Sequence, residues 1–102
     1  MHINIQNIGI TTVLELDGAF VFESFSTLRQ ACRPILDNAA IKFIQIELSK
    51  VNYVDSSALG MMLLMKEKAG NAGKLVQIKG AQGHVRGVLE VAKFDRMFEL
   101  LN

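Results

Sequence analysis

The sequence contains a single cysteine, Cys32, a single proline and no tryptophan. One cysteine cannot form an intramolecular disulfide or a zinc site with several thiolate ligands, so a disulfide-stapled fold and a cysteine-rich metal centre are excluded. Cys32 follows Ala31 and lies one helical turn after Leu28, which predicts a place on an apolar helix face. We therefore interpret it as a small core residue, because a reactive thiol requires exposure and a lowered pKa.

An excess of either charge is also missing. The chain has 11 basic and 10 acidic residues and a formal net charge of +1, with the two signs interspersed. Such a balance provides no broad positive surface for nucleic acid or for an anionic membrane. The densest cluster, Lys66-Glu67-Lys68, is short and mixed in sign, and we interpret it as a solvated helix face.

Long apolar runs are absent as well. Met61 to Met65 is the longest run inside a helical pattern, far short of the ~20 residues that a membrane span requires. The N-terminal segment MHINIQNIGITT has no basic stretch followed by an apolar one, so we expect no secretory signal. These features predict a soluble protein of the reducing cytoplasm.

Candidates for catalysis are few. The only histidines are His2, near the terminus, and His84, in a predicted helix, and neither has a histidine or cysteine close in sequence. We therefore expect no metal site and no cofactor. Neither Ser56 nor Ser57 has the Gly-x-Ser-x-Gly frame of a nucleophile elbow. A small hydrolase that uses one of them stays an alternative, because a distant histidine can approach in space, but no general base is evident.

Two other stretches have structural explanations. AGNAGKL resembles a phosphate-binding loop, but Leu75 stands where a magnesium-binding Ser or Thr belongs and a strand follows where a helix is required. We predict a helix-ending turn instead, with glycine supplying positive φ. The methionines at 61, 62 and 65 suit core packing, although flexible methionine surfaces also serve protein recognition.

The periodicity of the apolar residues predicts one α/β domain over residues 1–102, with a mostly parallel sheet that begins as an N-terminal hairpin and with helices packed against it. Asp17-Gly18 is the predicted turn after the opening strands, Ser24 the cap of the first helix, and Pro34 a kink within it. The final segment, 95–102, fits a short strand or a helical turn equally well. The predicted strands are 3–8, 11–16, 42–48 and 74–80, and the predicted helices are 23–39, 57–70 and 82–94.

The segment VDSSALG, residues 54–60, joins the predicted strand 42–48 to the next helix. Asp55 or Ser56 can cap this helix by accepting from the free amides of its first turn. The same position exposes a hydroxyl at the positive end of a helix dipole, where a phosphoryl group is tolerated. A phosphoserine would add close to two negative charges beside Asp55, which can abolish docking of a partner on this helix.

Over its whole length the chain resembles a STAS domain (sulfate transporter and anti-sigma factor antagonist). The segments that carry the resemblance are LDGAFVFESFSTL, KFIQIELSKVNYVDSSALG and HVRGVLEVAKFDRMFEL. The resemblance to the antagonist type implies a partner switch. The unmodified protein binds an anti-sigma factor that has serine kinase activity, phosphorylation of the serine after the aspartate blocks binding, and a serine phosphatase resets the switch.

Carried onto this chain, the resemblance implies phosphorylation of Ser56, with Ser57 as the fallback. The expected partner-binding residues are Asp55, Ser57, Ala58, Leu59, Gly60 and Met62. The resemblance to the antagonist type implies no enzymatic activity and no direct contact with nucleic acid. An alternative within the family is a small cytoplasmic STAS subunit of a lipid-trafficking ABC transporter, which would bind the ATPase and need no phosphorylation.

The chain departs from the antagonist pattern at two places. Ala58 stands where many antagonists have glycine, which favours the helix. The loop after the second strand reads Gly18-Ala19-Phe20-Val21, whereas the family's commonest loop is Gly-Glu-Leu-Asp. Both acids are therefore missing at Ala19 and Val21, beside the expected phosphorylation site.

Overall fold

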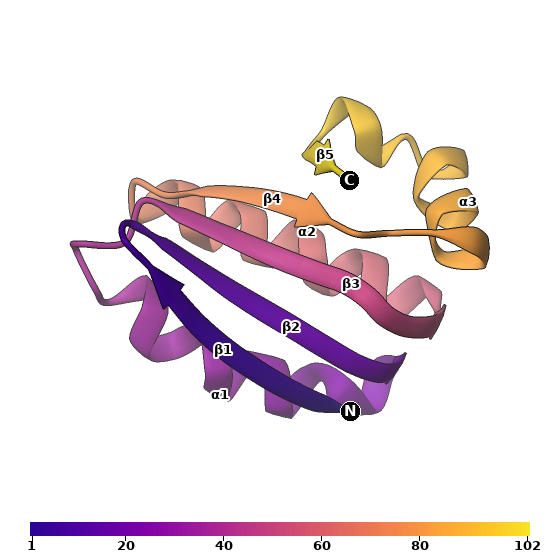
Figure 1. The fold of residues 1–102 in the computed structure, drawn as a ribbon, viewed down its shortest axis with the longest axis horizontal. Coiled ribbons are helices and arrows are strands. Elements are labelled where there is room, and N and C mark those ends of the chain that lie inside the picture. The colour runs from indigo at the N-terminus through magenta and orange to yellow at the C-terminus, as the bar shows by residue number, and fades with distance from the viewer.

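The computed structural model describes residues 1–102 and has the predicted order of strands and helices (Figure 1). The C-terminal segment contains both a 3-10 turn and a strand, the two structures that its sequence fits. The strands are β1 His2–Ile8, β2 Thr11–Phe20, β3 Phe43–Val54, β4 Leu75–Lys79 and β5 Glu99–Leu101. The helices are α1 Phe25–Leu36, α2 Ser56–Asn71 and α3 Gly83–Val91, with 3-10 turns η1 Phe22–Ser24 and η2 Phe94–Arg96.

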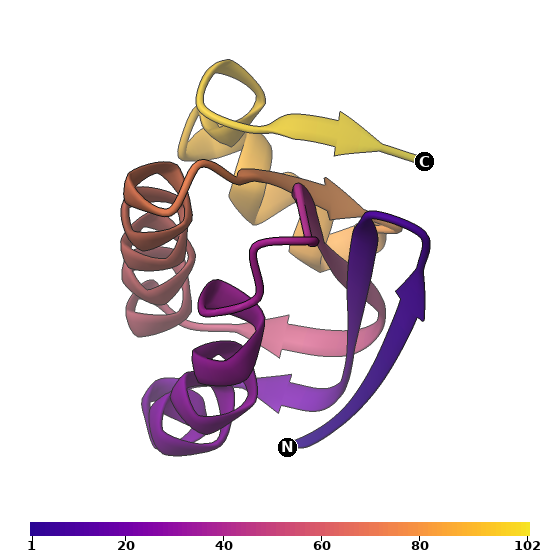
Figure 2. The same cartoon turned by 90° about the vertical axis from the view of Figure 1, so that its left-hand side faces the viewer.

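The five strands form one sheet in the order β1-β2-β3-β4-β5. β1 pairs antiparallel with β2, and every other neighbouring pair is parallel. The long helices α1 and α2 lie side by side on one face of the sheet, and α3 packs against β3 (Figures 1 and 2). The predicted α/β fold with a mostly parallel sheet is therefore confirmed, and no helix is long and apolar enough to cross a membrane.

The predicted opening hairpin is confirmed, but the prediction of a turn at Asp17-Gly18 is wrong. β1 and β2 are joined at Gly9–Ile10, where Gly9 has φ +61°. β2 does not stop at Asp17-Gly18 and continues to Phe20, paired with β3. The pairing shifts register between Glu15 and Asp17 and again after Gly18, which has φ +106°. The Asp-Gly pair thus forms an irregular stretch inside a strand, a common role for glycine.

The core lies between the sheet and the two long helices. Alternate residues of β2 and β3 point into it, and Leu14, Leu16 and Ile46 have no exposed surface. The methionines Met61, Met62 and Met65 are all buried there, so their prediction as core residues is confirmed. Cys32 is buried too, and burial raises the pKa of its thiol to about 11, in agreement with its predicted structural role.

The opposite face of the sheet carries polar side chains. Glu15 accepts hydrogen bonds from Asn4 Nδ2 and Lys50 Nζ, each at 3.3 Å. These bonds, together with the positive charge of Lys50, lower the pKa of Glu15. Gln45 Nε2 donates to Gln77 Oε1 at 3.0 Å on the neighbouring strand. The sheet is therefore amphipathic, and its helix-covered face holds the core.

The start and the end of α1 differ from prediction. Ser24 is the N-cap residue of α1, as the sequence predicts, but its side chain forms no capping hydrogen bond to the helix. Its Oγ instead accepts from Val21 N at 3.1 Å and donates to Ala19 O at 3.3 Å. Ser24 therefore stabilises the turn η1 before the helix. Pro34 lies in the last turn, and α1 ends at Leu36 instead of continuing to residue 39.

The turn after α2 has a feature that the sequence did not reveal. Gly73 has φ +75°, which confirms a helix-ending turn in place of a phosphate-binding loop. The next residue, Lys74, is buried, and its ammonium group donates to Asn38 O at 2.7 Å and Ile41 O at 2.9 Å. Through these two hydrogen bonds, Lys74 connects the α1–β3 loop to the turn before β4. Lysine is rarely buried in proteins, so the sequence alone does not indicate this structural role.

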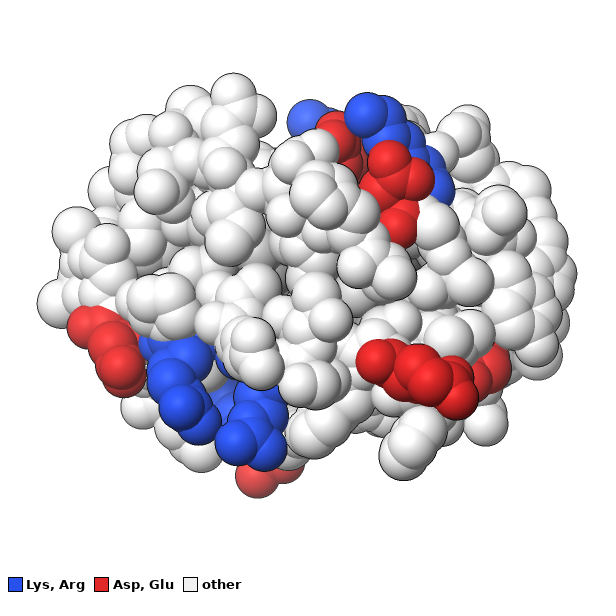
Figure 3. Space-filling view, turned by 90° about the horizontal axis from the view of Figure 1, so that it is seen from below, with Lys and Arg blue, Asp and Glu red and all other residues white.

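The surface carries charges of both signs, as the nearly equal numbers of basic and acidic residues predict. On the face drawn in Figure 3, acidic and basic side chains form small separate groups within a largely uncharged surface. Lys66, Glu67 and Lys68 are exposed on α2, as predicted. The Lys66 ammonium group lies 5.6 Å from the centre of the Phe98 ring.

Candidate docking site at the start of α2

The junction between β3 and α2 places the VDSSALG segment at one end of the central strand. β3 continues to Val54, beyond the apolar run 42–48 from which this strand is predicted. Asp55 is the N-cap residue and α2 begins at Ser56, so the predicted place of these two residues at the helix start is confirmed. Asp55 Oδ1 accepts from Ala58 N at 2.9 Å, which satisfies an amide of the first turn. Of the two candidate caps, the aspartate is the one that caps the helix.

Asp55 also connects this junction to the turn before α1. Its second carboxylate oxygen, Oδ2, accepts from Phe22 N at 3.1 Å. In addition, its amide donates to Phe20 O at 3.3 Å, at the end of β2. These bonds hold η1 beside the start of α2. The acid-free loop that includes Ala19 and Val21 therefore leads into this site.

The two serines differ in accessibility. Ser56 is exposed and Ser57 is half-buried. Neither hydroxyl forms a hydrogen bond to another protein group, since Asp55 fulfils the capping role. Ser56 is the first residue of a 16-residue helix and therefore lies at the positive end of its dipole. Its hydroxyl is free to contact a partner or to accept a phosphoryl group.

Large apolar side chains are exposed around this helix start. Phe22 is 67% exposed and Phe25 is 37% exposed, and the hydrogen bond to Asp55 fixes the turn that carries Phe22. Tyr53, two residues before Asp55, is 49% exposed and stacks on His84 with ring centres 5.7 Å apart. Exposed apolar groups such as Phe22 and Phe25, which are neighbours on η1 and the first turn of α1, are typical of a protein-binding surface.

The structure corrects part of the predicted binding surface. Ala58 and Met62 have no exposed surface and point into the core, so they cannot contact a partner directly. Leu59 is half-buried and Gly60 is exposed, so both are accessible beside Ser56. The accessible predicted residues are thus Asp55, Ser56, Ser57, Leu59 and Gly60.

Sequence reasoning missed the aromatic residues Phe22, Phe25 and Tyr53. A signal for Phe22 was present, because this phenylalanine lies in the turn region between the predicted Asp17-Gly18 turn and the helix predicted from residue 23. An apolar residue in such a turn has no helix or strand face to bury it. The exposure of Tyr53 required the strand register, which places it on the side away from the buried Val54.

Metal and hydrolytic chemistry receive no support from the geometry. No group of three His, Cys, Asp or Glu residues is placed to hold a metal ion. His2 hydrogen-bonds Asn4, and His84 stacks on Tyr53, so neither histidine is paired with Ser56. A nucleophilic serine needs an adjacent base.

Comparison with known protein families identifies one that matches almost the whole chain. Residues 3–102 match the family described as Mlab, STAS domain. The chain belongs to the STAS domain family. A STAS-domain containing protein of Pseudomonas aeruginosa (strain UCBPP-PA14) is 26% identical to this STAS domain over 92 residues, which cover 90% of this chain and 89% of the relative.

Two solved structures share the fold of this STAS domain. An anti-sigma factor antagonist from Mycobacterium paratuberculosis has a TM-score of 0.85 at 18% identity, covering 98% of this chain and 84% of the other. The Bacillus cell fate determinant SpoIIAA in its phosphorylated form has a TM-score of 0.74 at 14% identity, covering 99% and 92%. At such identities the likeness shows the fold alone.

Proposed function

We propose that this STAS domain is an anti-sigma factor antagonist that works as a phosphorylation-controlled partner switch. With Ser56 unmodified, the start of α2 docks on an anti-sigma factor with serine kinase activity. Phosphorylation of Ser56 ends that binding, and a serine phosphatase restores it. The observation that carries the proposal is the exposed Ser56 hydroxyl, free of protein hydrogen bonds, beside the exposed Phe22 and Phe25.

The switch follows from charge and desolvation. A neutral hydroxyl can enter an apolar interface at small cost, whereas a phosphoserine carries about −1.5 to −2 charges at neutral pH. Asp55, next in sequence, adds a further carboxylate at the same helix start. Burying the phosphate against a partner without a cation to receive it costs several kcal/mol. A loss of only about 2.7 kcal/mol weakens binding roughly a hundredfold.

The related structures support this choice of function. One of them is described as an anti-sigma factor antagonist and another as a phosphorylated form. The helix dipole at Ser56 is compatible with the modified state, because a phosphate is stabilised at a helix N-terminus. Phosphorylation would therefore change docking while leaving the helix intact.

A specific observation favours a second candidate, the small subunit of a lipid-trafficking ABC transporter. The loop before the site has Ala19 and Val21 in place of the acids of the commonest antagonist loop. The aromatic surface that follows it is apolar whatever the state of Ser56. A subunit that binds an ATPase permanently needs such a surface and no phosphorylation.

Two variants and one control test the switch. Ser56→Ala keeps a neutral side chain and should bind the co-purified partner as the unmodified protein does. Ser56→Asp adds one negative charge and should lose most of the binding in calorimetric titration. Asn71→Asp adds the same charge at the other end of α2 and should bind normally. Equal affinities of the two Ser56 variants, together with an ABC ATPase as the co-purified partner, would favour the second candidate.

A further inference from the structure

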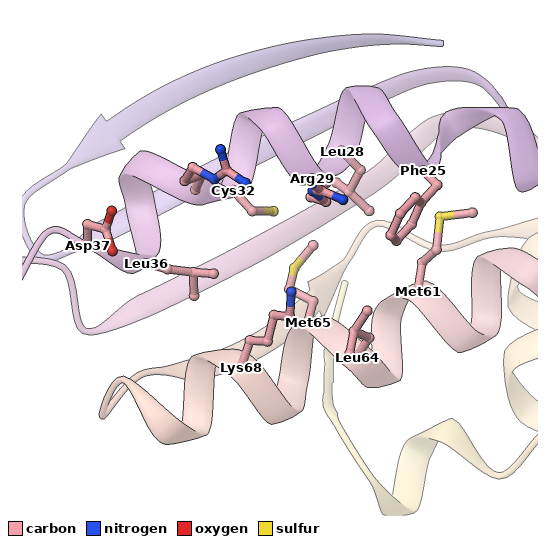
Figure 4. Close-up of a pocket in the computed structure, with 11 residues that line it drawn as sticks. Phe25, Leu28, Arg29, Cys32, Leu36, Asp37, Met61, Leu64, Met65 and Lys68 are labelled. Atoms are coloured by element: carbon pink, nitrogen blue, oxygen red, sulfur yellow. The ribbon is translucent and has the colours of Figure 1, made fainter.

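A cleft of about 140 Å³ opens between α1 and α2 (Figure 4). Most of its lining is apolar. Leu28 and Cys32 contribute from α1, and Met61, Leu64 and Met65 contribute from α2. Leu64 is 38% exposed, so part of this apolar surface contacts solvent.

Basic side chains border the cleft. Arg29 and Arg33 come from α1 and Lys68 from α2, whereas Asp37 is the single acid among the lining residues. None of the three cations forms a salt bridge, since the two ion pairs of the protein, Lys50–Glu15 and Arg86–Glu90, lie elsewhere. The border of the cleft therefore has unneutralised positive charge.

The size of the cleft limits what can enter it. An engineered cavity of about 150 Å³ lined by leucine, isoleucine and phenylalanine holds one benzene molecule. The cleft is similar in volume and so has room for one bulky apolar side chain. The flexible side chains of Met61 and Met65 can adjust to its shape. The cleft therefore fits a partner segment in which one apolar side chain is flanked by acidic groups.

We propose that this cleft is a second docking site, which receives an amphipathic helix of a partner protein. The helix inserts one phenylalanine or leucine side chain between α1 and α2 and places its acidic residues near Arg29, Arg33 and Lys68. The charge complementarity selects an acidic helix over a basic one. The assignment of this helix to the anti-sigma factor rests on the proposed function, whereas the docking chemistry does not.

The cleft lies close enough to Ser56 for electrostatic coupling. Met61, at its near end, is the sixth residue of α2, so the rise along the helix from Ser56 is about 7.5 Å. Phe25 lines the same end and also belongs to the exposed surface beside Ser56. A Debye length of about 8 Å at physiological salt means that a phosphate on Ser56 acts on this end. Phosphorylation would therefore weaken docking of an acidic helix.

A synthetic peptide tests the docking chemistry without the natural partner. The probe is a fluorescein-labelled amphipathic helix with one central phenylalanine on its apolar face and glutamates on its polar face. Fluorescence anisotropy measures its binding to the full chain. We expect saturable binding that weakens about tenfold when Arg29 and Arg33 are both changed to Glu. The amide NMR signals of Cys32 and Leu64 should shift on titration.

Matched controls decide the outcome. Changing Lys42 and Arg96 both to Glu makes the same charge change at two exposed cations outside the cleft lining, and this double variant should bind the probe normally. Peptides with lysine in place of glutamate, or alanine in place of phenylalanine, should bind at least about tenfold more weakly. Equal binding of the acidic and basic peptides, or chemical shift changes confined to other elements, would overturn the proposal. If the acidic peptide binds as described but Ser56→Asp does not affect it, the cleft stands and its coupling to the switch is refuted.

Discussion

Removal of the Asp55 side chain should destabilise the protein by breaking two hydrogen bonds at one point. Its Oδ1 caps α2 through Ala58 N, and its Oδ2 holds Phe22 N on η1. Loss of an N-cap costs about 0.5–2 kcal/mol. Loss of a second hydrogen bond adds about 0.5–1.5 kcal/mol. We therefore expect Asp55→Ala to lower the free energy of unfolding by about 1–3.5 kcal/mol.

Urea unfolding at neutral pH measures this change, with two further variants to separate its parts. Asp55→Ser retains a capping hydroxyl for Ala58 N but cannot reach Phe22 N, so it should lose only about 0.5–1.5 kcal/mol. Asp17→Ala removes an exposed acid without a hydrogen-bond partner and should stay within about 0.5 kcal/mol of the unmodified protein. If Asp55→Ala matched Asp17→Ala, the carboxylate would not organise the site as we describe.

Three other predictions concern single residues. Lys74→Met should lower the free energy of unfolding by about 2 kcal/mol in urea titration, because Asn38 O and Ile41 O lose a buried donor; an unchanged midpoint would contradict it. The pKa of the Cys32 thiol rises from 9.0 to about 11 on folding, so stability should fall as pH increases through this interval, and Cys32→Ala should remove that part of the pH dependence. Phe22→Ser should weaken partner binding at least about tenfold in calorimetry while stability changes by less than about 0.5 kcal/mol, because the ring is 67% exposed; a loss of stability without a loss of affinity would place Phe22 outside the interface.

The sequence predicted the β3–α2 junction because its signals are local and agree. An apolar strand, a capping acid and a helix-forming segment meet within VDSSALG, and the structure places Asp55 and Ser56 accordingly. The sequence also predicted part of the buried face of α2. Ala58, Met62, Met65 and Ala69 recur at helical spacing and form its buried face. Leu63 and Leu64 are apolar as well but exposed, so composition alone did not identify that face.

Features that depend on distant contacts were not predictable. Asp17-Gly18 has the composition of a turn, but pairing with β3 extends β2 through it to Phe20. The buried place of Lys74 depends on two carbonyl groups more than thirty residues away in sequence. The cleft between α1 and α2 likewise requires the two helices to lie side by side.

The most direct test of the partner switch compares one protein preparation before and after phosphatase treatment. The protein is phosphorylated by its co-purified kinase, mass spectrometry locates the phosphate, and calorimetric titration measures the affinity for that kinase. We predict a single phosphate on Ser56, at least a hundredfold weaker binding of the phosphorylated protein, and full recovery of affinity when the phosphatase removes it. Equal affinities before and after treatment, or a chain that no partner kinase modifies, would contradict the switch.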